Sequence, residues 1–239
     1  MHRFYCPDIV STLTLPEEES RHCVRVLRLK EGDRIEVVDG RSTCYEMSIA
    51  IAHPKRCAVQ IVAALEQKPH WKNHITLAVA PTKHLDRMEW MAEKCVEMGV
   101  DRIIPLHCHN SERTTLKTER LLKIMVAAMK QSLKAHLPQL DEMTSFRQLL
   151  AEPFSGQRFI AYCDAELPRE QRKHFAKEYQ PAKDVMVLIG PEGDFSPEEV
   201  QAALSAGFVP VTLGESRLRT ETAAVKAIAA IHTLNELIS

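Results

Sequence analysis

The sequence lacks any apolar run close to the roughly 18–20 residues that a membrane-spanning helix needs. Its first residues, MHRFYCPDIV, also lack the charged-then-apolar pattern of a secretory signal. The hydrophobic fraction of 45% and the charged fraction of 26% are those of an ordinary globular protein. We therefore expect a cytoplasmic protein that makes no contact with a membrane.

Paired cysteines are missing as well. The chain has seven cysteines, an odd number, with no Cys-x-x-Cys pair, at positions Cys6, Cys23, Cys44, Cys57, Cys95, Cys108 and Cys163. This argues against a disulfide framework and against a thiolate zinc site. His107-Cys108-His109 is a candidate metal group, but a tetrahedral site needs a second ligand pair that the sequence does not offer. The prediction is that no metal is bound.

An excess of positive charge is absent too, because the formal net charge is −1. No global basic field therefore indicates a nucleic-acid partner. A local basic stripe is sufficient for RNA binding, so that hypothesis has to rest on local features.

The first seventy residues are predicted to be mostly strands with one helix. Strands are expected at residues 2–6, 34–39, 43–51 and 57–65, with turn signals at Asp39-Gly40 and His53-Pro54. Thr14 and Glu17 have the spacing of a capping box, which predicts a helix start with Pro16 in its first turn. The pattern indicates a small β-barrel with one helix.

Beyond a predicted linker at residues 67–73, strands and helices alternate. Strands are expected at 74–80, 102–107, 158–163, 185–189 and 209–213, and helices at 85–98, 118–135, 169–178, 197–206 and 221–237. This alternation predicts an α/β domain, a parallel sheet with helices on both faces.

One segment joins a fully apolar strand, residues 185–189, to the loop Gly190-Pro191-Glu192-Gly193. Ser196, Pro197 and Glu199 then supply a cap, a proline at the first helical position and a capping-box carboxylate. Ligands of open α/β sheets bind at the carboxyl ends of strands, and glycines let the backbone approach a ligand closely. The alternative is a tight strand-to-helix turn that merely requires glycine.

A second segment, residues 211–224, has the same organisation. A strand ends in a loop at Gly214, and an alanine-rich helix follows that is capped by Thr220 or Thr222. Arg217, Arg219 and Glu221 concentrate charge at the strand end, although surface ion pairing alone would contribute little stability. Because both loops follow neighbouring strands, a ligand site is better supported by the pair than by either loop alone.

At this point the sequence resembles a known family. Ile189-Gly190-Pro191-Glu192-Gly193, Leu213-Gly214 and Leu218-Arg219-Thr220-Glu221-Thr222-Ala223 are similar to the motifs of the RsmE family in the SPOUT superfamily, as are His22 with Val26-Leu27-Arg28, Lys94 to Val100 with Pro105, Ser111-Glu112-Arg113 and Lys130-Gln131-Ser132. The resemblance covers nearly the whole chain. It departs at Asp194, where a glycine is common, and at Leu133-Lys134, where many members have Gly-Arg.

The resemblance implies methylation of N3 of one uridine in 16S ribosomal RNA of the small subunit, with S-adenosylmethionine as cofactor. It implies a small PUA-like β-barrel that binds RNA at residues 1–70 and a SPOUT domain with a C-terminal trefoil knot at residues 71–239, in a homodimer. By analogy, the cofactor site comprises Leu188, Ile189, Gly190, Pro191, Glu192, Gly193, Leu213, Gly214, Leu218, Arg219, Thr220, Thr222 and Ala223.

The reaction itself suggests roles for charged residues, because uracil N3 must lose a proton while the cofactor supplies the methyl group. Arg219 is the candidate for stabilising a uracilate anion or gripping a phosphate, and Glu221 for accepting a proton or orienting Arg219. The alternative for this catalytic pair is a structural salt bridge.

RNA contacts are expected from basic residues at helical spacing. Arg21, Arg25 and Arg28, with His22 beside them, are predicted to form one stripe, and Lys83, Arg87 and Lys94 another on the first helix of the second domain. Such residues bind the phosphates of the RNA backbone without recognising the base sequence.

Other functions remain open on the sequence. One is a SPOUT methyltransferase with a different target base, and another is a non-catalytic RNA-binding protein that keeps a ligand pocket. A phosphate-binding enzyme is disfavoured because the GxxxxGK[ST] cradle is missing.

Overall fold

A computed structural model describes residues 1–162 and 173–237 of the chain. The chain divides into two compact units, Met1–His70 with Val126–Leu137, and Trp71–Met125 with Pro138–Ser239. The stretch Val126–Leu137, which the sequence analysis placed in the second domain, therefore groups with the first unit. We call these the N-terminal unit and the C-terminal unit.

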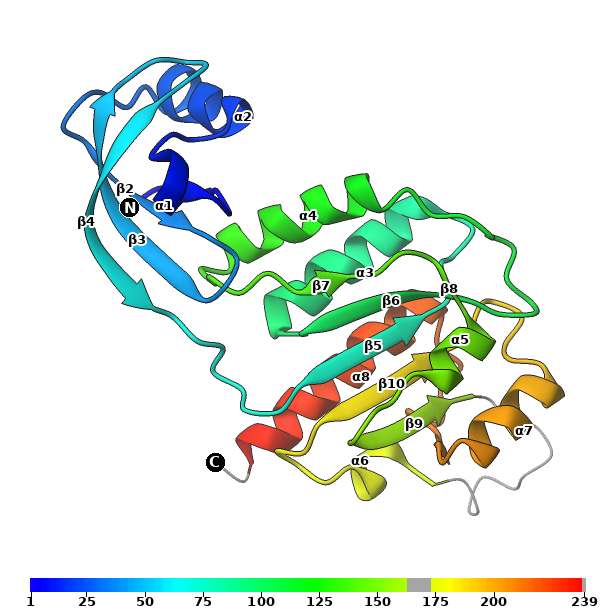
Figure 1. Ribbon diagram of the computed structural model, residues 1–239. Helices are drawn as coiled ribbons and strands as arrows, with labels where there is room; N and C mark the ends of the chain where they lie inside the picture. The colour runs from blue at the N-terminus through cyan, green and yellow to red at the C-terminus, as the bar shows by residue number, and fades with distance from the viewer. Residues whose placement is uncertain (163–172, 238–239) are drawn as a thin grey trace. The chain divides into compact units, whose positions relative to one another are not determined.

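The N-terminal unit is built on a four-stranded sheet in the order β1-β2-β3-β4 (Figure 1). Its strands are β1 (Arg3–Tyr5), β2 (Arg34–Val38), β3 (Thr43–Ile51) and β4 (Ala58–Glu66). β1 pairs with β2 in parallel, and the other pairs are antiparallel. The predicted turn at Asp39-Gly40 joins β2 to β3, and Asp39 Oδ1 accepts hydrogen bonds from the amides of Arg41 and Thr43. The strands predicted for this region all form.

The helical part of the N-terminal unit differs from the prediction. It comprises α1 (Ile9–Thr12), α2 (Glu17–Arg21) and the π-helix η1 (His22–Val26). The predicted capping box is wrong: Pro16 is the N-cap of α2, and Thr14 instead forms an isolated bridge to Ala58. Because α2 begins at Glu17, this glutamate is the first residue of the helix and not the third, which a capping box with Thr14 would require.

The C-terminal unit contains a seven-stranded sheet. Its strands are β5 (Ile75–Val79), β6 (Arg102–His107), β7 (Gln139–Leu140), β8 (Thr144–Ser145), β9 (Gln157–Ala161), β10 (Val185–Ile189) and β11 (Val209–Val211). The order is β11-β9-β10-β5-β6-β7, with β8 paired to β6, and all of these pairs are parallel. The predicted parallel sheet is confirmed.

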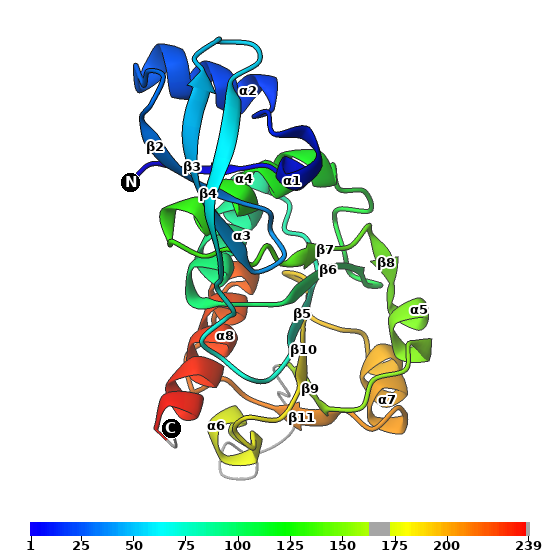
Figure 2. The same cartoon turned by 60° about the vertical axis from the view of Figure 1, so that its left-hand side comes forward.

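Helices cover both faces of this sheet, as predicted. The helices after β5 are α3 (Leu85–Met98), α4 (Thr118–Gln131), α5 (Phe146–Ala151), α6 (Phe175–Glu178), α7 (Pro197–Ser205) and α8 (Thr220–Glu236), and the second half of α4, from Val126, belongs to the N-terminal unit. Figure 2 shows α3 and α8 on one side of β5, β10 and β9, and α5 and α7 on the other. The helix predicted at 169–178 begins outside the described residues. Within the described part of that range, the structure has α6.

The two faces follow from the alternation of side chains along each strand. Met186 and Leu188 of β10 pack with Phe146 of α5 and Ala203 of α7 in one buried cluster. Val185, Val187 and Ile189 alternate with them and are also buried, as is usual for a strand covered by helices on both faces.

The part of the connection from β6 to β9 that follows α4 was not predicted. It contains β7, β8 and α5, and α5 begins with a capping box in which Ser145 and Gln148 exchange hydrogen bonds. The sequence Ser145-Phe146-Arg147-Gln148 carried that signal.

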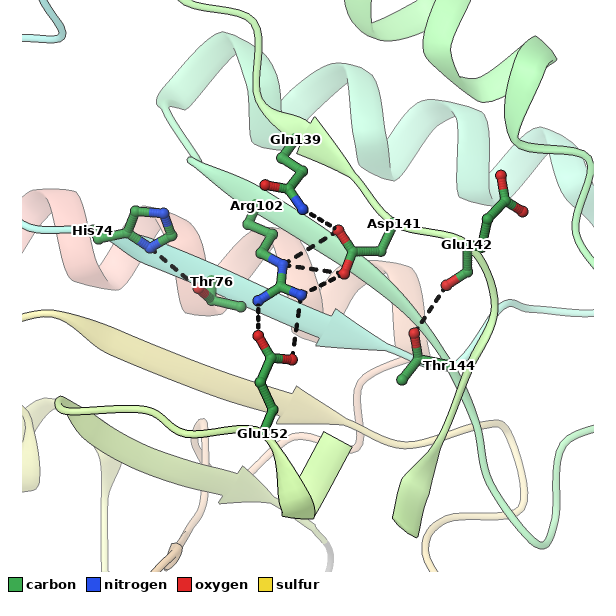
Figure 3. A network of polar contacts seen from close by, with 8 residues as sticks. All are labelled: His74, Thr76, Arg102, Gln139, Asp141, Glu142, Thr144 and Glu152. Atoms are coloured by element: carbon green, nitrogen blue, oxygen red, sulfur yellow. Dashed lines mark hydrogen bonds and ion pairs between the residues drawn. The ribbon is translucent and has the colours of Figure 1, made fainter. Parts of the chain in front are cut away.

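A polar network holds this connection to the sheet (Figure 3). Arg102, at the start of β6, donates to both carboxylate oxygens of Asp141, with Nη2 2.5 Å from Oδ2, and also pairs with Glu152 at the end of α5. These hydrogen bonds, chiefly those to Asp141, raise the pKa of Arg102, so the guanidinium stays charged. The network therefore ties two separate points of the connection to one strand.

No helix within residues 1–162 and 173–237 is long and apolar enough to cross a membrane. The trefoil knot remains a prediction.

Candidate cofactor site

A cavity of about 400 Å³ lies in the C-terminal unit at the carboxyl ends of β9, β10 and β11. Its walls come from the ends of these strands, the loops that follow β10 and β11, the start of α8 and one residue of α3. The lining residues are Arg87, Ala161, Tyr162, Ile189, Gly190, Pro191, Glu192, Asp194, Val211, Thr212, Leu213, Gly214, Ser216, Arg217, Leu218, Arg219, Thr220 and Ala223.

The sheet order brings these segments together. β9 pairs with both β10 and β11, so the carboxyl ends of the three parallel strands are neighbours. The hydroxyl of Thr220, the first residue of α8, donates to the carbonyl oxygen of Gly190 at 3.0 Å, and both groups are buried. This hydrogen bond joins the two loops that the sequence analysis singled out.

The glycines of the loop after β10 meet different demands. A Cβ on Gly190 would lie 3.1 Å from the Phe195 ring and 3.3 Å from its backbone nitrogen. A Cβ on Gly193 would lie 3.0 Å from the Cβ of Asn110. Gly190 therefore permits close packing of the Phe195 ring, whereas Gly193 permits close packing against the loop that follows β6.

Asn110 was missed by the sequence analysis. Its side-chain nitrogen donates to the carbonyl oxygens of Gly193 and Asp194, both at 3.1 Å, so it braces the loop after β10 from a position 83 residues earlier than Gly193. No local pattern marks such a contact, because only the sheet order makes the two loops neighbours.

Most of the predicted cofactor residues line the cavity: Ile189, Gly190, Pro191, Glu192, Leu213, Gly214, Leu218, Arg219, Thr220 and Ala223. The others do not. Leu188 is fully buried in the core on the face of α5 and α7, since β10 alternates its side chains. Gly193 packs against Asn110, and Thr222 is exposed on α8.

Several lining residues were not predicted as part of the site. Ala161 and Tyr162 end β9, whose position between β10 and β11 was not evident from the sequence. Val211, Thr212, Ser216 and Arg217 belong to the second predicted segment but were not selected within it. Asp194 was noted only as a departure from the family pattern.

The proposed catalytic pair separates in the structure. Arg219 is the exposed N-cap residue of α8 and lines the cavity. Glu221 is 7% exposed and does not line it; its carboxylate pairs with Arg87, with Oε1 3.8 Å from Nε. The ion pair of Glu221 is therefore with Arg87 of α3, not with Arg219.

The charged groups of the cavity lie on different segments. Arg217 and Arg219 come from the segment after β11 and Arg87 from α3, whereas Glu192 and Asp194 come from the loop after β10. A ligand that carries charges of both signs would find partners for each.

The predicted RNA-binding residues of the N-terminal unit are exposed: Arg21, His22, Arg25 and Arg28. They do not form one regular α-helical stripe. Arg25 lies in the π-helix, where the spacing of residues per turn is wider, and Arg28 lies beyond the helix with φ of 57°.

The second predicted stripe is also not regular. Lys83 precedes α3, and its ammonium group is 2.9 Å from Glu112, which raises the pKa of Lys83. Lys94 pairs with Glu93 and Glu97, and these contacts raise its pKa. Arg87 is turned to the cavity, so the three do not share one basic face.

The six cysteines within the described part of the chain are buried and unpaired. Burial raises the pKa of Cys95 and Cys108 thiols, which keeps them protonated. No group of three or more His, Cys, Asp or Glu that could hold a metal ion occurs among residues 1–162 and 173–237.

The fold and the cavity define an α/β protein with a small-molecule site at the carboxyl ends of its parallel strands. Residues 69–232 match the RNA methyltransferase domain family, and residues 15–62 match the RNA methyltransferase PUA domain family. The chain belongs to this family of RNA methyltransferases, and the resemblance to RsmE proteins is confirmed.

Individual relatives agree with this assignment. The solved "probable rRNA-methyltransferase" of Porphyromonas gingivalis is 44% identical, with a TM-score of 0.94 over 100% of both chains. Ribosomal RNA small subunit methyltransferase E of Neisseria gonorrhoeae, solved bound to S-adenosyl methionine, is 29% identical with a TM-score of 0.83 over 98% of both chains. The Synechocystis protein of the same name is 29% identical over 95% of this chain and 75% of its own length.

Proposed function

We propose that the protein transfers a methyl group from S-adenosylmethionine to a base of ribosomal RNA. The observation that carries this proposal is the cavity at the carboxyl ends of β9, β10 and β11, formed by the two segments whose sequences resemble RsmE motifs. Relatives that match nearly the whole chain are named rRNA methyltransferases, and one of them was solved with bound S-adenosyl methionine.

The residues present fit this cofactor. A volume of about 400 Å³ falls within the range of small-molecule sites. Ile189, Leu213 and Leu218 offer apolar walls, and Gly190 contributes main-chain atoms to the lining. These residues would hold the adenosine portion, and the charged residues of the rim would face the polar remainder. The bound cofactor would supply an activated methyl group on a sulfonium.

For the target we propose N3 of one uridine in 16S rRNA, the reaction that the RsmE resemblance implies. Removal of the N3 proton leaves an anion, and a nearby guanidinium favours that anion. We assign Arg219 to this task. It is exposed, it lines the cavity, and it is the residue immediately before α8. Arg87 is a second cavity guanidinium, and Glu221 acts through it as a positioning residue.

The RNA is proposed to contact the N-terminal unit through Arg21, His22, Arg25 and Arg28, all of which are exposed. We retain residues 1–70 as the RNA-binding domain and 71–239 as the methyltransferase domain within this proposal, together with a homodimer, a small-subunit substrate and a cytoplasmic location. The match of residues 15–62 to an RNA methyltransferase PUA domain supports the RNA contact.

The deciding experiment uses small ribosomal subunits from a strain that lacks the gene. Incubation with the protein and S-adenosylmethionine should add one methyl group at uridine N3, identified by mass spectrometry of nuclease fragments. A methyl group on another base would assign the protein to another SPOUT activity. Cofactor binding without any methylation would favour a non-catalytic RNA-binding protein.

The same assay tests Arg219. Arg219→Ala should lower turnover roughly 100-fold, the usual effect of removing one group that stabilises developing charge, with a much smaller effect on the cofactor Kd. Arg147→Ala, an exposed arginine of α5 outside the cavity, is the matched control. Turnover of Arg219→Ala equal to that of the control would leave Arg219 a structural residue.

A further inference from the structure

Hydrogen bonds connect the loop after β10, which forms one wall of the cavity, to three other segments of the C-terminal unit. The carbonyl of Gly190 accepts from Thr220 of α8, and two carbonyls further along the loop accept from Asn110. The third connection is the side chain of Glu192, a lining residue, whose Oε1 accepts from the backbone amide of Lys83 at 3.1 Å. This third hydrogen bond joins the loop after β10 to the loop between β5 and α3.

The amide of Lys83 is one end of a peptide group whose other end is also held. The carbonyl of that peptide belongs to Thr82, which is fully buried. A trans peptide group is planar, and its carbonyl and its amide point in opposite directions. Whatever fixes the Thr82 carbonyl therefore also fixes the direction of the amide that Glu192 accepts from.

Arg113, in the loop after β6, fixes this carbonyl. Its Nε donates to the carbonyl oxygen of Thr82 at 3.1 Å, and its Nη2 donates to the carbonyl oxygen of Lys83 at 2.6 Å. Because the guanidinium is a rigid planar fork, its hydrogen bonds to two successive carbonyls define the orientation of the backbone between them. Arg113 is half-buried and lies outside the cavity lining.

The side chain of Lys83 takes no part in this connection. Its ammonium group is 2.9 Å from the carboxylate of Glu112. The hydrogen bond to Glu192 comes from the backbone amide alone, so its geometry depends on how the peptide group is oriented and not on where the Lys83 side chain lies.

We propose that Arg113 is a positioning residue of the cofactor site. Through the peptide group between Thr82 and Lys83 it holds Glu192, and with it the loop after β10, in the arrangement that binds S-adenosylmethionine. This inference rests on the proposed function. A loop that is ordered before the ligand arrives loses less conformational freedom on binding, so removal of Arg113 weakens binding without removing any group of the cavity lining.

The test is a double-mutant cycle on the full chain, with the Kd for S-adenosylmethionine measured by isothermal titration. Arg113→Ala should weaken binding roughly three- to tenfold, the effect of losing a hydrogen bond that holds a binding group. Glu192→Ala removes the carboxylate that the peptide group holds and should weaken binding at least as much. In the Glu192→Ala background, Arg113→Ala should cause little further loss, because the connection through which it acts is already absent.

Two further variants make the result specific. Arg113→Lys keeps the charge but has no planar fork to span both carbonyls, so its Kd should lie between those of the wild type and Arg113→Ala. Arg120→Ala removes an arginine of the same unit that is 72% exposed and pairs with Glu89, and it should leave the Kd unchanged. Thermal denaturation shows whether each variant is folded at the temperature of the titration, and the cycle is run with Arg113→Lys if Arg113→Ala is not.

The outcomes separate the inference from the proposed function. If removal of Arg113 lowers the affinity by the same factor with and without Glu192, it acts by another route and the inference is wrong. An unchanged affinity after removal of Arg113 contradicts the inference as well. If the wild-type protein does not bind S-adenosylmethionine, the proposed function itself fails, whatever the variants do.

Discussion

At the scale of single residues, two threonines of α8 show what the helix register decides. The sequence analysis assigned both Thr220 and Thr222 to the cofactor site. Thr220 is 6% exposed and its hydroxyl donates to the carbonyl oxygen of Gly190, whereas Thr222 is exposed and outside the lining. Two residues along a helix turn the side chain by more than half a circle, so only one of them can face the site.

Thr220→Val tests this hydrogen bond. Valine keeps the shape but removes the donor, which leaves the buried carbonyl of Gly190 without the hydroxyl it accepts from. We expect a loss of about 1–2 kcal/mol in the free energy of unfolding and up to roughly tenfold weaker S-adenosylmethionine binding, measured by chemical denaturation and titration calorimetry. Thr222→Val, the same change at the exposed position, should alter neither. Equal effects of the two variants would show that the link between Thr220 and Gly190 does not shape the cavity.

The sequence predicted much of the site because its motifs are local. Glycines, a helix start and nearby arginines all lie within the two segments after β10 and β11. Asn110 and Arg87 could not be selected for the roles they have, because each reaches the site from another strand or helix through the fold. Glu221 likewise pairs with Arg87, which is distant along the chain.

At the scale of elements, the bounds of α3, β6 and β10 were predicted as observed, since α3 has a helical periodicity and β6 and β10 are short, largely apolar runs with clear ends. The failures have physical causes. β7 and β8 are too short to show a periodicity, and they form because β6 offers a free edge for pairing. The π-helix η1 has no distinct sequence pattern, so an ordinary helix was expected.

The Arg102 network is the element-scale feature with the clearest effect on stability (Figure 3). Arg102→Met removes the cation and leaves the carboxylates of Asp141 and Glu152, which are only 15% and 32% exposed, close together. Removing one partner of a buried ion pair is strongly destabilising, and the partial exposure reduces the effect, so we expect a loss of about 2 kcal/mol. Thermal and urea denaturation would measure it.

The matched control is Arg34→Met. Arg34 pairs with Glu46 at 3.2 Å, with side chains 49% and 37% exposed, and such surface pairs contribute at most about 1 kcal/mol. A loss in Arg102→Met no larger than in Arg34→Met would mean that the connection from β6 to β9 is held by its apolar contacts alone.

At the scale of the whole molecule, the class of fold could be predicted and the order of the strands could not. Alternating strands and helices are sufficient to indicate a parallel sheet. The order β11-β9-β10-β5-β6-β7 depends on how long connections cross the sheet, which no local signal records. The grouping of residues 126–137 with the N-terminal unit depends on tertiary contacts in the same way.

The position of the cavity within one unit leads to a prediction for the intact chain. Every lining residue belongs to the C-terminal unit, so S-adenosylmethionine should stabilise that unit directly. At a concentration of 100 Kd, a ligand specific for the folded state adds about 2.7 kcal/mol, which corresponds to a rise in Tm of roughly 5–10 °C for a chain of this size.

Hydrogen exchange with mass spectrometry should show slower exchange at residues 189–194 and 211–220, with no change in β2, β3 and β4. Methionine alone, as a control, should produce neither effect. Protection confined to β2, β3 and β4 would place the cofactor in the N-terminal unit and contradict the assignment of the cavity, because a ligand slows exchange first where it covers and orders the backbone.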